Sequence, residues 1–378
     1  MARLGERTPS GWVIGHIRRT PVVFAPSWFL LAIVLGAIVA PTITRVVPDV
    51  GALTTILAAA SVPLMLLLSV LAHELCHGMA GHAVGAPPRE YVLTLWGGHT
   101  QFVTDMRTPG ASALVSVAGP AANAVLALGA WLVLGQTTEP LAFVLWQIAA
   151  LSNGVVAVFN LLPGLPLDGG RVLEAAVWKL TGNRDTGTLA AGWGGRAVVV
   201  LLAVVMLGLP LLRGGRPTII SALWVVVLGS YLWASSGQAV RLVHARRRAA
   251  GIELRALAEP AVAMPDAAPV ATLDDPALAG RRVVLLDDAG RVSGLVEPSS
   301  AGQVPPDARG TTPLSAVAVA LPATSVVTVL SGAAAVSAAA HAARSTPVVV
   351  LADGAAGVVG VLAIARLEQA LADRSRGR

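Results

Sequence analysis

Six apolar runs constrain this chain more than any other feature of its sequence. Most of them approach the roughly 20 residues that a helix needs to cross the hydrocarbon of a bilayer. The chain is 55% hydrophobic and only 13% charged, with a mean hydropathy of +0.71, which is too apolar for an ordinary soluble domain. The sequence therefore predicts a polytopic α-helical membrane protein with about six transmembrane helices. The runs cover residues 24–40, 56–83, 112–134, 141–162, 197–212 and 218–236.

The fifth run is the shortest, and glycines lie on both sides of it, at 192–195 and at 214–215. This leaves open an alternative in which the fifth and sixth runs form a tight hairpin instead of two full spans. The first run has no small-residue cleavage site, so we interpret it as a retained anchor.

The distribution of arginine predicts which side of the membrane each end occupies. Four arginines precede the first run, within residues 1–23, and four more follow the sixth run, between 241 and 248. The loop at 135–140 has no Lys or Arg, whereas Arg213 and Arg216 depart from the pattern. Positive residues gather on the cytoplasmic side, and an even number of spans places both termini together. We expect a multi-pass protein of the cell membrane with cytoplasmic N- and C-termini.

Three ionisable side chains, His73, Glu74 and His77, lie inside the second run. Such residues are costly at membrane depth and usually have a function. On a helix the two histidines lie one turn apart on one face, the spacing at which two imidazoles hold one zinc ion, with Glu74 beside them. As a mere core residue, Glu74 would be a buried carboxylate with no cation nearby in sequence, which favours the metal site. Cys76 is the only cysteine, so an intramolecular disulfide and a Cys–Cys metal motif are excluded.

A carboxylate follows the fourth run. Between Asn160 and Asp168 two prolines and a glycine interrupt the helix, and two more glycines follow Asp168. Broken backbone at membrane depth occurs only inside protein or at a water-filled cavity. Because the second and fourth runs both point toward the cytoplasm, we expect Asn160 and Asp168 at the depth of His73 and His77. The resulting hypothesis is one Zn²⁺ ion per chain, held by the two histidines and Asp168.

Residues 91–103 have the pattern of a β-hairpin with Gly97–Gly98 in a primed turn. Two roles remain open for this segment. It is either a structural flap that covers the site or an exposed edge that pairs with an extended peptide. In the second case the residues expected to bind substrate are Tyr91, Thr94, Gly97, Gly98 and Phe102.

The third run contains Gly119-Pro-Ala-Ala-Asn123. Small residues allow helices to approach closely, and an amide can form hydrogen bonds between helices within the bilayer. We interpret Gly119 and Asn123 as structural residues of helix packing.

Beyond about residue 250 the apolar runs shorten and turn residues separate them, which predicts a soluble α/β domain. Residues 283–296 resemble residues 348–362, with one residue inserted in the turn. This duplicated strand-turn-strand unit indicates a tandem module. The expected organisation is a cytoplasmic N-terminal segment at 1–23, a transmembrane domain at 24–236, a basic linker at 237–250 and a C-terminal domain at 251–372.

The segments His73-Glu-Leu-Cys-His77 and Asn160-Leu-Leu-Pro-Gly-Leu-Pro-Leu-Asp168-Gly-Gly resemble the two halves of the active site in the site-2 protease family of intramembrane zinc metalloproteases. Gly119-x-x-x-Asn123 resembles a third element of that family, and the resemblance covers about 20–236. It implies a zinc metalloendopeptidase that cleaves transmembrane segments of membrane-anchored proteins, in regulated intramembrane proteolysis. It also implies that Glu74 is the general base and that Asn160 helps to hold the oxyanion.

The C-terminal domain is similar to a tandem pair of CBS domains. This resemblance implies a regulatory domain, with an adenine nucleotide as a ligand to test and a homodimer as an assembly to test. No loop of the membrane domain is long enough to contain an inserted PDZ domain.

A CBS-regulated metal-ion transporter is the alternative function, because His, Glu and Asp within membranes often line ion pathways. Transporters commonly contain two matched broken helices in inverted repeats, and this sequence contains one broken segment. The net charge of +6 could indicate nucleic-acid binding, but the arginines lie mostly at the edges of apolar runs. The expected partners are transmembrane protein substrates and the lipid bilayer, and not nucleic acid.

Overall fold

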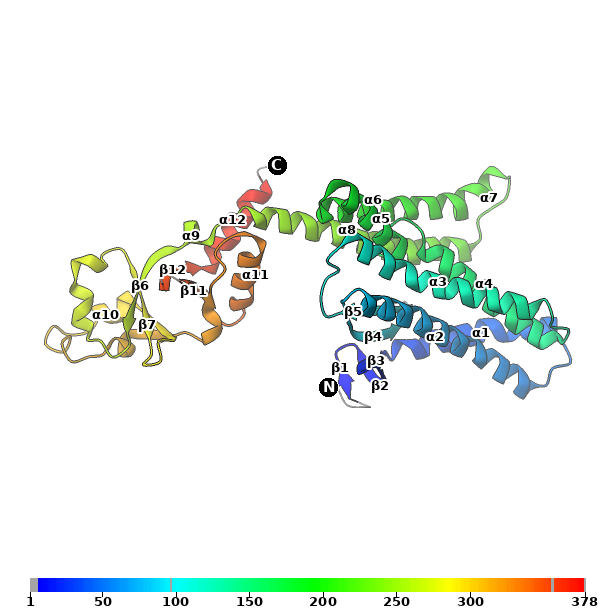
Figure 1. Cartoon of the computed structure of the whole chain (residues 1–378), viewed down its shortest axis with the longest axis horizontal. Helices are drawn as coiled ribbons and strands as arrows, with labels where there is room; N and C mark the ends of the chain where they lie inside the picture. The colour runs from blue at the N-terminus through cyan, green and yellow to red at the C-terminus, as the bar shows by residue number, and fades with distance from the viewer. Residues whose placement is uncertain (1–5, 96, 355–356, 377–378) are drawn as a thin grey trace. The chain divides into compact units, whose positions relative to one another are not determined.

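A computed structural model describes residues 6–95, 97–354 and 357–376 of the chain. The chain divides after Arg241 into two compact units, each with its own core. Figure 1 traces the chain from the N-terminus in blue to the C-terminus in red.

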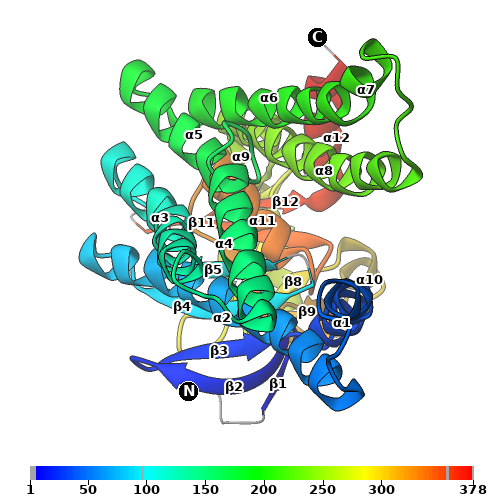
Figure 2. The same ribbon diagram turned by 90° about the vertical axis from the view of Figure 1, so that its right-hand side faces the viewer.

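Among the described residues six helical segments are long and apolar enough to cross a membrane, the number that the sequence predicts. The helix that carries the two histidines lies beside the next two helices in both views (Figures 1 and 2). Large apolar side chains such as Leu53 and Ile56 are mostly exposed on the outer faces, as expected for helices surrounded by lipid. The segments are α1 (Ser27–Val46), α2 (Ala52–Ala83), α3 (Pro109–Leu134), α4 (Pro140–Asn160), α6 (Arg184–Ala203) continued by a π-helical turn (Val204–Gly208) and α7 (Leu209–Leu212), and α8 (Ile219–Ala250).

The helix that contains the fifth run begins at Arg184, well before residue 197, and is long enough to cross a membrane, so the short hairpin alternative is wrong. The glycines that the sequence places at its edge lie inside α6, where other segments approach its backbone. A Cβ at Gly192 would lie 2.6 Å from Val240 of α8, and one at Gly195 would overlap the side chain of Ser236. Close packing, rather than a helix end, explains these glycines.

A five-stranded sheet packs against the C-terminal half of α2. Its strands are β1 (Arg7–Thr8), β2 (Gly11–Ile17), β3 (Thr20–Phe24), β4 (Pro88–Thr94) and β5 (Gly97–Phe102), in that order across the sheet. Strands β3 and β4 are parallel, and the other pairs are antiparallel. Tyr91 and Leu93 on one face pack against apolar residues of α2, while Val13, Val23 and Val92 form a buried cluster on the other.

The N-terminal segment is therefore part of the membrane unit, and not a separate segment as the expected boundary at residue 23 implies. Its described residues from Arg7 onward supply three strands to the sheet. Parallel pairing between β3 and β4 joins residues on either side of the α1–α2 pair, and such distant pairing leaves no local signal in the sequence.

The predicted hairpin is present as β4 and β5, but the predicted turn is wrong. Gly97 lies opposite Thr94 and Gly98 lies opposite Leu93, so both glycines belong to β5 and not to the turn. Leu95 follows β4 in a turn conformation, and Trp96 lies outside the described residues.

The expectation that Tyr91 and Thr94 lie on an exposed edge is also wrong, because β4 is an inner strand between β3 and β5. Strand β3 of the N-terminal segment pairs with the edge of β4 that the hairpin alone would leave unpaired.

The second unit contains a seven-stranded sheet in the order β10-β11-β12-β6-β7-β8-β9. The duplicated unit appears as the antiparallel pairs β7–β8 and β11–β12. The short helices of the unit are α9 (Leu254–Leu257), α10 (Pro298–Gly302), α11 (Gly332–Ala342) and α12 (Ile364–Arg376). The strands are β6 (Glu259–Pro265), β7 (Arg282–Leu286), β8 (Val292–Val296), β9 (Ala318–Ala320), β10 (Val326–Val327), β11 (Val348–Asp353) and β12 (Gly357–Ala363).

The two repeats exchange strands reciprocally. Strand β6 pairs with β7 of its own repeat and, through Pro260 and Gly360, with β12 of the other. In the same way β10 pairs with β11 of its own repeat. Strand β9, which directly precedes β10 in the chain, pairs with β8 of the other repeat, with Ala320 opposite Gly294. Val284 and Val350 lie opposite Leu295 and Val361, which are equivalent residues of the two repeats, and all four share one buried cluster. Reciprocal use of equivalent surfaces is the pattern of a pseudo-twofold relation.

Two features do not follow from the sequence expectation. Between β6 and β7 the first repeat has only 3-10 turns, where the second repeat has the helix α11, because Pro269 and Pro276 interrupt this part of the chain. The basic segment at 237–250 is helical and forms the last part of α8, a conformation that the sequence analysis does not specify.

Candidate metal centre

Helix α2 places His73 and His77 one turn apart, with their rings edge to face and the centroids 4.7 Å apart. Asp168 is the first residue of the short helix α5 (Asp168–Thr181), directly after the break that follows α4. The two Nε2 atoms lie 3.0 Å apart, and Asp168 Oδ2 lies 3.1 Å from His73 Nε2 and 3.3 Å from His77 Nε2. Among the described residues these three form a group whose ligand atoms could hold one metal ion.

The spacing of these atoms fits zinc. Bonds of about 2.0–2.2 Å in a tetrahedral site place the ligand atoms roughly 3.3 Å from one another. The observed separations of 3.0, 3.1 and 3.3 Å match three corners of such a tetrahedron. The fourth corner is left for water or substrate.

Each histidine directs Nε2 to the centre because its Nδ1 is occupied elsewhere. His77 Nδ1 lies 2.6 Å from the carbonyl oxygen of Val115, which can only accept a hydrogen bond. His73 Nδ1 contacts the side-chain oxygen of Asn123. Both Nδ1 atoms therefore carry the proton, and both Nε2 lone pairs face Asp168. Three acceptor atoms that converge without a proton between them repel one another unless a cation joins them.

A buried polar network fixes the orientation of Asn123. Its Nδ2 donates to Ser69 Oγ and to Asn153 Oδ1, both at 2.9 Å, so the oxygen of the amide must face His73. Ser69 Oγ donates to Asn153 Oδ1 at 2.6 Å, which links α2, α3 and α4. All three residues are buried. Partners of this kind orient metal-binding histidines.

Asn123 thus contacts a candidate metal ligand in addition to packing helices. The sequence prediction missed Ser69 and Asn153. Their signal was the same as that of Asn123, a polar side chain inside an apolar run.

Gly119 lies one turn before Asn123 on α3, at the closest approach of this helix to the centre. A Cβ at this position would overlap the Nε2 atoms of both histidines. Glycine therefore leaves the space in which the ligand atoms converge, a more specific role than the general helix packing that the sequence indicates.

Glu74 belongs to α2, its side chain lies against β5, and the residue is only 4% exposed. Thr100 Oγ1 donates to Glu74 Oε2 at 2.7 Å and also lies 3.1 Å from the Glu74 carbonyl oxygen. A Cβ at Gly98 would lie 2.5 Å from Glu74 Cγ, so the carboxylate side chain needs a glycine on the strand above it. Thr100 was not predicted, although it lies two residues after Gly98 and hence on the same face of the strand.

The segment between α4 and α5 holds Asp168 in place. Leu165 N donates to the carbonyl oxygen of Ala191 in α6 at 3.0 Å, and Ser236 Oγ in α8 donates to the carbonyl oxygen of Leu165 at 2.6 Å. A Cβ at Gly170 would overlap the backbone of Gly164. The position of Asp168 therefore depends on both α6 and α8.

Three other residues that the sequence predicts for the site lie outside the group of candidate ligands. Asn160 ends α4 and is half-buried, and among the described residues no hydrogen bond joins it to the three ligands. Tyr91 and Phe102 direct their rings toward α2, where they lie against Gly78 and Gly81. Tyr91 is only 3% exposed, so its side chain belongs to the core.

Comparison with known proteins identifies relatives of this chain. The model of peptidase family M50 matches residues 135–205, which include Asn160 and Asp168. The protein sll0528 of Synechocystis, by name a candidate zinc metalloprotease, is 31% identical over 234 residues. That match covers 60% of this chain and 59% of the relative, so this chain spans about three fifths of the relative's length.

A solved site-2 protease from Methanocaldococcus jannaschii is similar over 61% of this chain and 94% of its own, with 20% identity and a TM-score of 0.41, too distant to establish a shared fold. Rip3 of Mycobacterium tuberculosis, also a candidate zinc metalloprotease by name, is 32% identical over 276 residues, which cover 70% of this chain and 68% of Rip3. On the extent of this last match, together with the family model, the chain belongs to peptidase family M50, the family of the site-2 proteases.

Proposed function

We propose that this chain is an intramembrane zinc metalloendopeptidase of the site-2 protease type. The observation that carries the proposal is the convergence of His73, His77 and Asp168 beside the buried Glu74, within a helix long enough to span the membrane. The substrates are transmembrane segments of membrane-anchored proteins, and the family resemblance implies regulated intramembrane proteolysis.

Zinc bound by the three ligands would supply an acidified water and polarise the peptide carbonyl. Glu74 is the general base that takes a proton from the water and returns it to the leaving nitrogen. Thr100 holds Oε2 of this carboxylate, which leaves Oε1 to exchange the proton. Asn160 is the proposed donor to the oxyanion, on the family resemblance, and its place at the end of α4 puts it near the break that leads to Asp168.

Peptide bonds of an intact helix are shielded by their own hydrogen bonds, so a substrate must unwind locally before it is cut. We infer that the unwound segment adds to β5, which is one of the two edge strands of the sheet and the one that contacts Glu74. Gly98 and Thr100 of β5 contact Glu74, so a peptide on this edge would lie beside the general base. Gly97, Gly98 and Phe102 remain the proposed substrate-binding positions.

We propose that both termini are cytoplasmic. The excess of arginine before α1 and at the end of α8 supports this orientation. The sheet supports a common side for the N-terminal strands and the hairpin, because α1 and α2 lie between them in the chain and return it to the same side.

For the second unit we propose a tandem CBS pair that regulates the protease. The reciprocal strand pairing of its two repeats supports a paired module. An adenine nucleotide in the cleft between the repeats and a homodimer through this unit are the two forms of regulation to test. Calorimetry of the full chain with ATP, ADP and AMP tests the first, and the mass of the detergent-solubilised chain tests the second.

A metal-ion transporter is the competing function. It is less well supported, because a general base beside the ligands has a role in hydrolysis and no role in passing an ion. Zinc flux into vesicles that contain the wild-type chain, without cleavage of any membrane protein, would favour transport.

The test of the protease is the pair Glu74→Gln and Asp168→Ala. The first keeps the shape of the side chain but cannot accept the proton, so it retains zinc and loses cleavage. The second loses both. Glu368→Gln makes the same change at an exposed position of the second unit and should retain both. Full zinc and full cleavage in Asp168→Ala would show that another group is the third ligand.

A further inference from the structure

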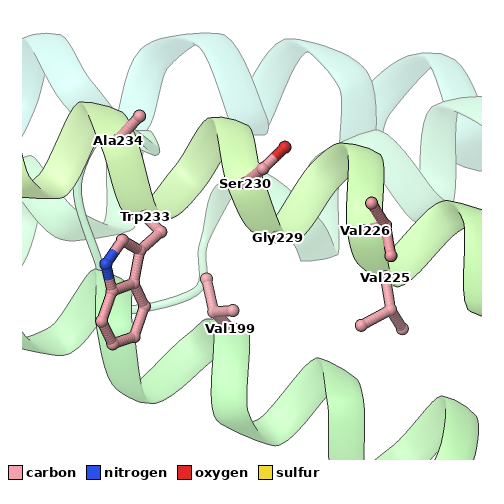
Figure 3. A pocket seen from close by; sticks show the side chains of 7 residues that line it. All are labelled: Val199, Val225, Val226, Gly229, Ser230, Trp233 and Ala234. Carbon is pink, nitrogen blue, oxygen red and sulfur yellow. The ribbon is translucent and has the colours of Figure 1, made fainter.

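An open apolar groove of about 370 Å³ runs between α6 and α8 (Figure 3). Its lining includes Val199 of α6 and Val226, Gly229 and Trp233 of α8. Gly229 deepens the groove, since a Cβ there would lie 3.3 Å from Val199 Cγ1. Ser230 supplies the one hydroxyl among the lining side chains that Figure 3 labels.

Two arginines lie close together beyond the Trp233 end of this groove. A Cβ at Gly237 would lie 3.2 Å from Arg241 Nη1 and 3.9 Å from Arg196 Nη2, so both guanidinium groups flank the same glycine. Within the described ranges no ion pair joins either arginine to a carboxylate, and the Nε of Arg196 is buried without a hydrogen-bond acceptor. Two neighbouring positive charges and a buried donor without a partner indicate a site for an anion.

Tryptophan rings hold the first of these arginines in place. The Arg196 guanidinium lies 4.4 Å from the ring centroid of Trp193 and 5.3 Å from that of Trp233. Cation–π contacts of this kind orient a guanidinium without neutralising its charge. Trp233 both lines the groove and contacts Arg196, so the apolar groove and the cationic end form one continuous surface.

Both arginines lie at the edge of the apolar part of their helices. Arg196 directly precedes the apolar run at 197–212, and Arg241 follows the run at 218–236. Because α6 and α8 cross the membrane in opposite directions, these positions fall at the same boundary between hydrocarbon and water. Lipid phosphates lie at this level, and tryptophan gathers there.

We propose that this surface is a binding site for an anionic phospholipid. One acyl chain would lie in the groove along Val226 and Gly229, and the phosphate would accept hydrogen bonds from Arg196 and Arg241. Arginine is suited to phosphate because its planar fork presents several donors in a fixed geometry. The site adjoins Ser236, which holds Leu165 in the segment before Asp168. A bound lipid would therefore steady the side of α8 that supports the third metal ligand.

The test uses the full chain with a photoreactive benzophenone amino acid in place of Ala234, which lines the groove. The protein is reconstituted in vesicles of equal parts phosphatidylglycerol and phosphatidylcholine and irradiated, and the mass of the intact chain identifies the adduct. Two arginines near the membrane surface predict a preference for phosphatidylglycerol of roughly tenfold or more. Arg196→Gln with Arg241→Gln should reduce this preference to none.

Two further pairs of substitutions separate lipid binding from general charge and from folding. Arg213→Gln with Arg216→Gln removes the same charge at the other end of the α6–α8 pair and should retain the preference. Arg196→Lys with Arg241→Lys keeps both charges and should retain most of it.

Equal adducts of the two lipids in the wild-type chain would overturn the proposal, as would an undiminished preference in the Gln pair. A dominant adduct with a second copy of the chain, or with an added transmembrane peptide, would show that a protein helix occupies the groove instead. Displacement of the phosphatidylglycerol adduct by millimolar inorganic phosphate would show a site for a small anion and not for a phospholipid.

Discussion

Replacing Thr100 with valine tests how the proposed general base is held. Valine keeps the size of threonine, so the change removes the donor to Glu74 Oε2, at 2.7 Å, without opening a cavity. Glu74 is 4% exposed, and water therefore cannot easily take the place of the hydroxyl. A hydrogen bond to a buried charged group contributes roughly 1.5–3 kcal/mol. If that energy serves to orient the carboxylate in the transition state, kcat should fall roughly tenfold to hundredfold.

The assay measures cleavage of a model transmembrane substrate in detergent, together with the zinc content of each preparation. Thr100→Val should lower kcat, with KM and zinc unchanged, because Thr100 contacts neither the metal ligands nor, in this account, the substrate side chains. Thr100→Ser keeps the hydroxyl and should stay close to the wild type. A Thr100→Val protein with full zinc and a kcat within about twofold of the wild type would refute the orienting role.

Three other outcomes follow from the same geometry. Gly98→Ala places a Cβ 2.5 Å from Glu74 Cγ and should lower cleavage at least tenfold with zinc retained. The control Gly110→Ala adds a Cβ that meets nothing within 4 Å and should have no effect on cleavage. Equal activities of the two variants would mean that the strand can move aside. Asn123→Leu removes the partner of His73 Nδ1 and should weaken zinc binding roughly 10–100-fold in a competition titration with a chelator, and unchanged affinity would remove Asn123 from the metal site. Stripping zinc with a chelator should abolish cleavage and lower the melting temperature, and both should return when zinc is added; activity that survives the loss of zinc would exclude a metalloprotease.

The parts of the site that depend on local periodicity were predictable from the sequence. The one-turn spacing of His73 and His77 follows from the helical repeat, and the break before Asp168 follows from its prolines and glycines. That the three side chains meet required the further inference that the second and fourth spans run in the same direction. The structure brings the three ligand atoms to within 3.3 Å of one another.

The parts that depend on distant pairing were not predictable. Nothing near Thr20–Phe24 indicates that this strand pairs with β4, yet this pairing makes β4 an inner strand and leaves β5 as the edge strand of the hairpin. Tyr91 is buried because its ring lies against Gly78 of α2, a second distant contact that the local sequence does not indicate. Thr100 and Ser69 were missed because a hydroxyl is common in any strand or span, and only the position of Glu74 or Asn123 opposite makes it significant.

Glycine misled the prediction in two places for one reason. Gly97–Gly98 has the composition of a turn, and Gly192 and Gly195 have the composition of a helix end. In the structure Gly98 leaves room for Glu74, and Gly195 leaves room for Ser236 and the carbonyl of Leu165. A glycine that accommodates a neighbour from another element has the same local sequence as one that forms a turn.

X-ray absorption at the zinc edge of the purified chain tests directly whether His73, His77 and Asp168 hold zinc. We expect one zinc per chain, with two imidazole nitrogens at about 2.0–2.1 Å and the remaining ligands oxygen at about 2.0–2.2 Å. We also expect Asp168→Ala to lose the metal. A sulfur ligand at about 2.3 Å, which only Cys76 or a methionine could supply, or a full complement of zinc in Asp168→Ala, would contradict this assignment.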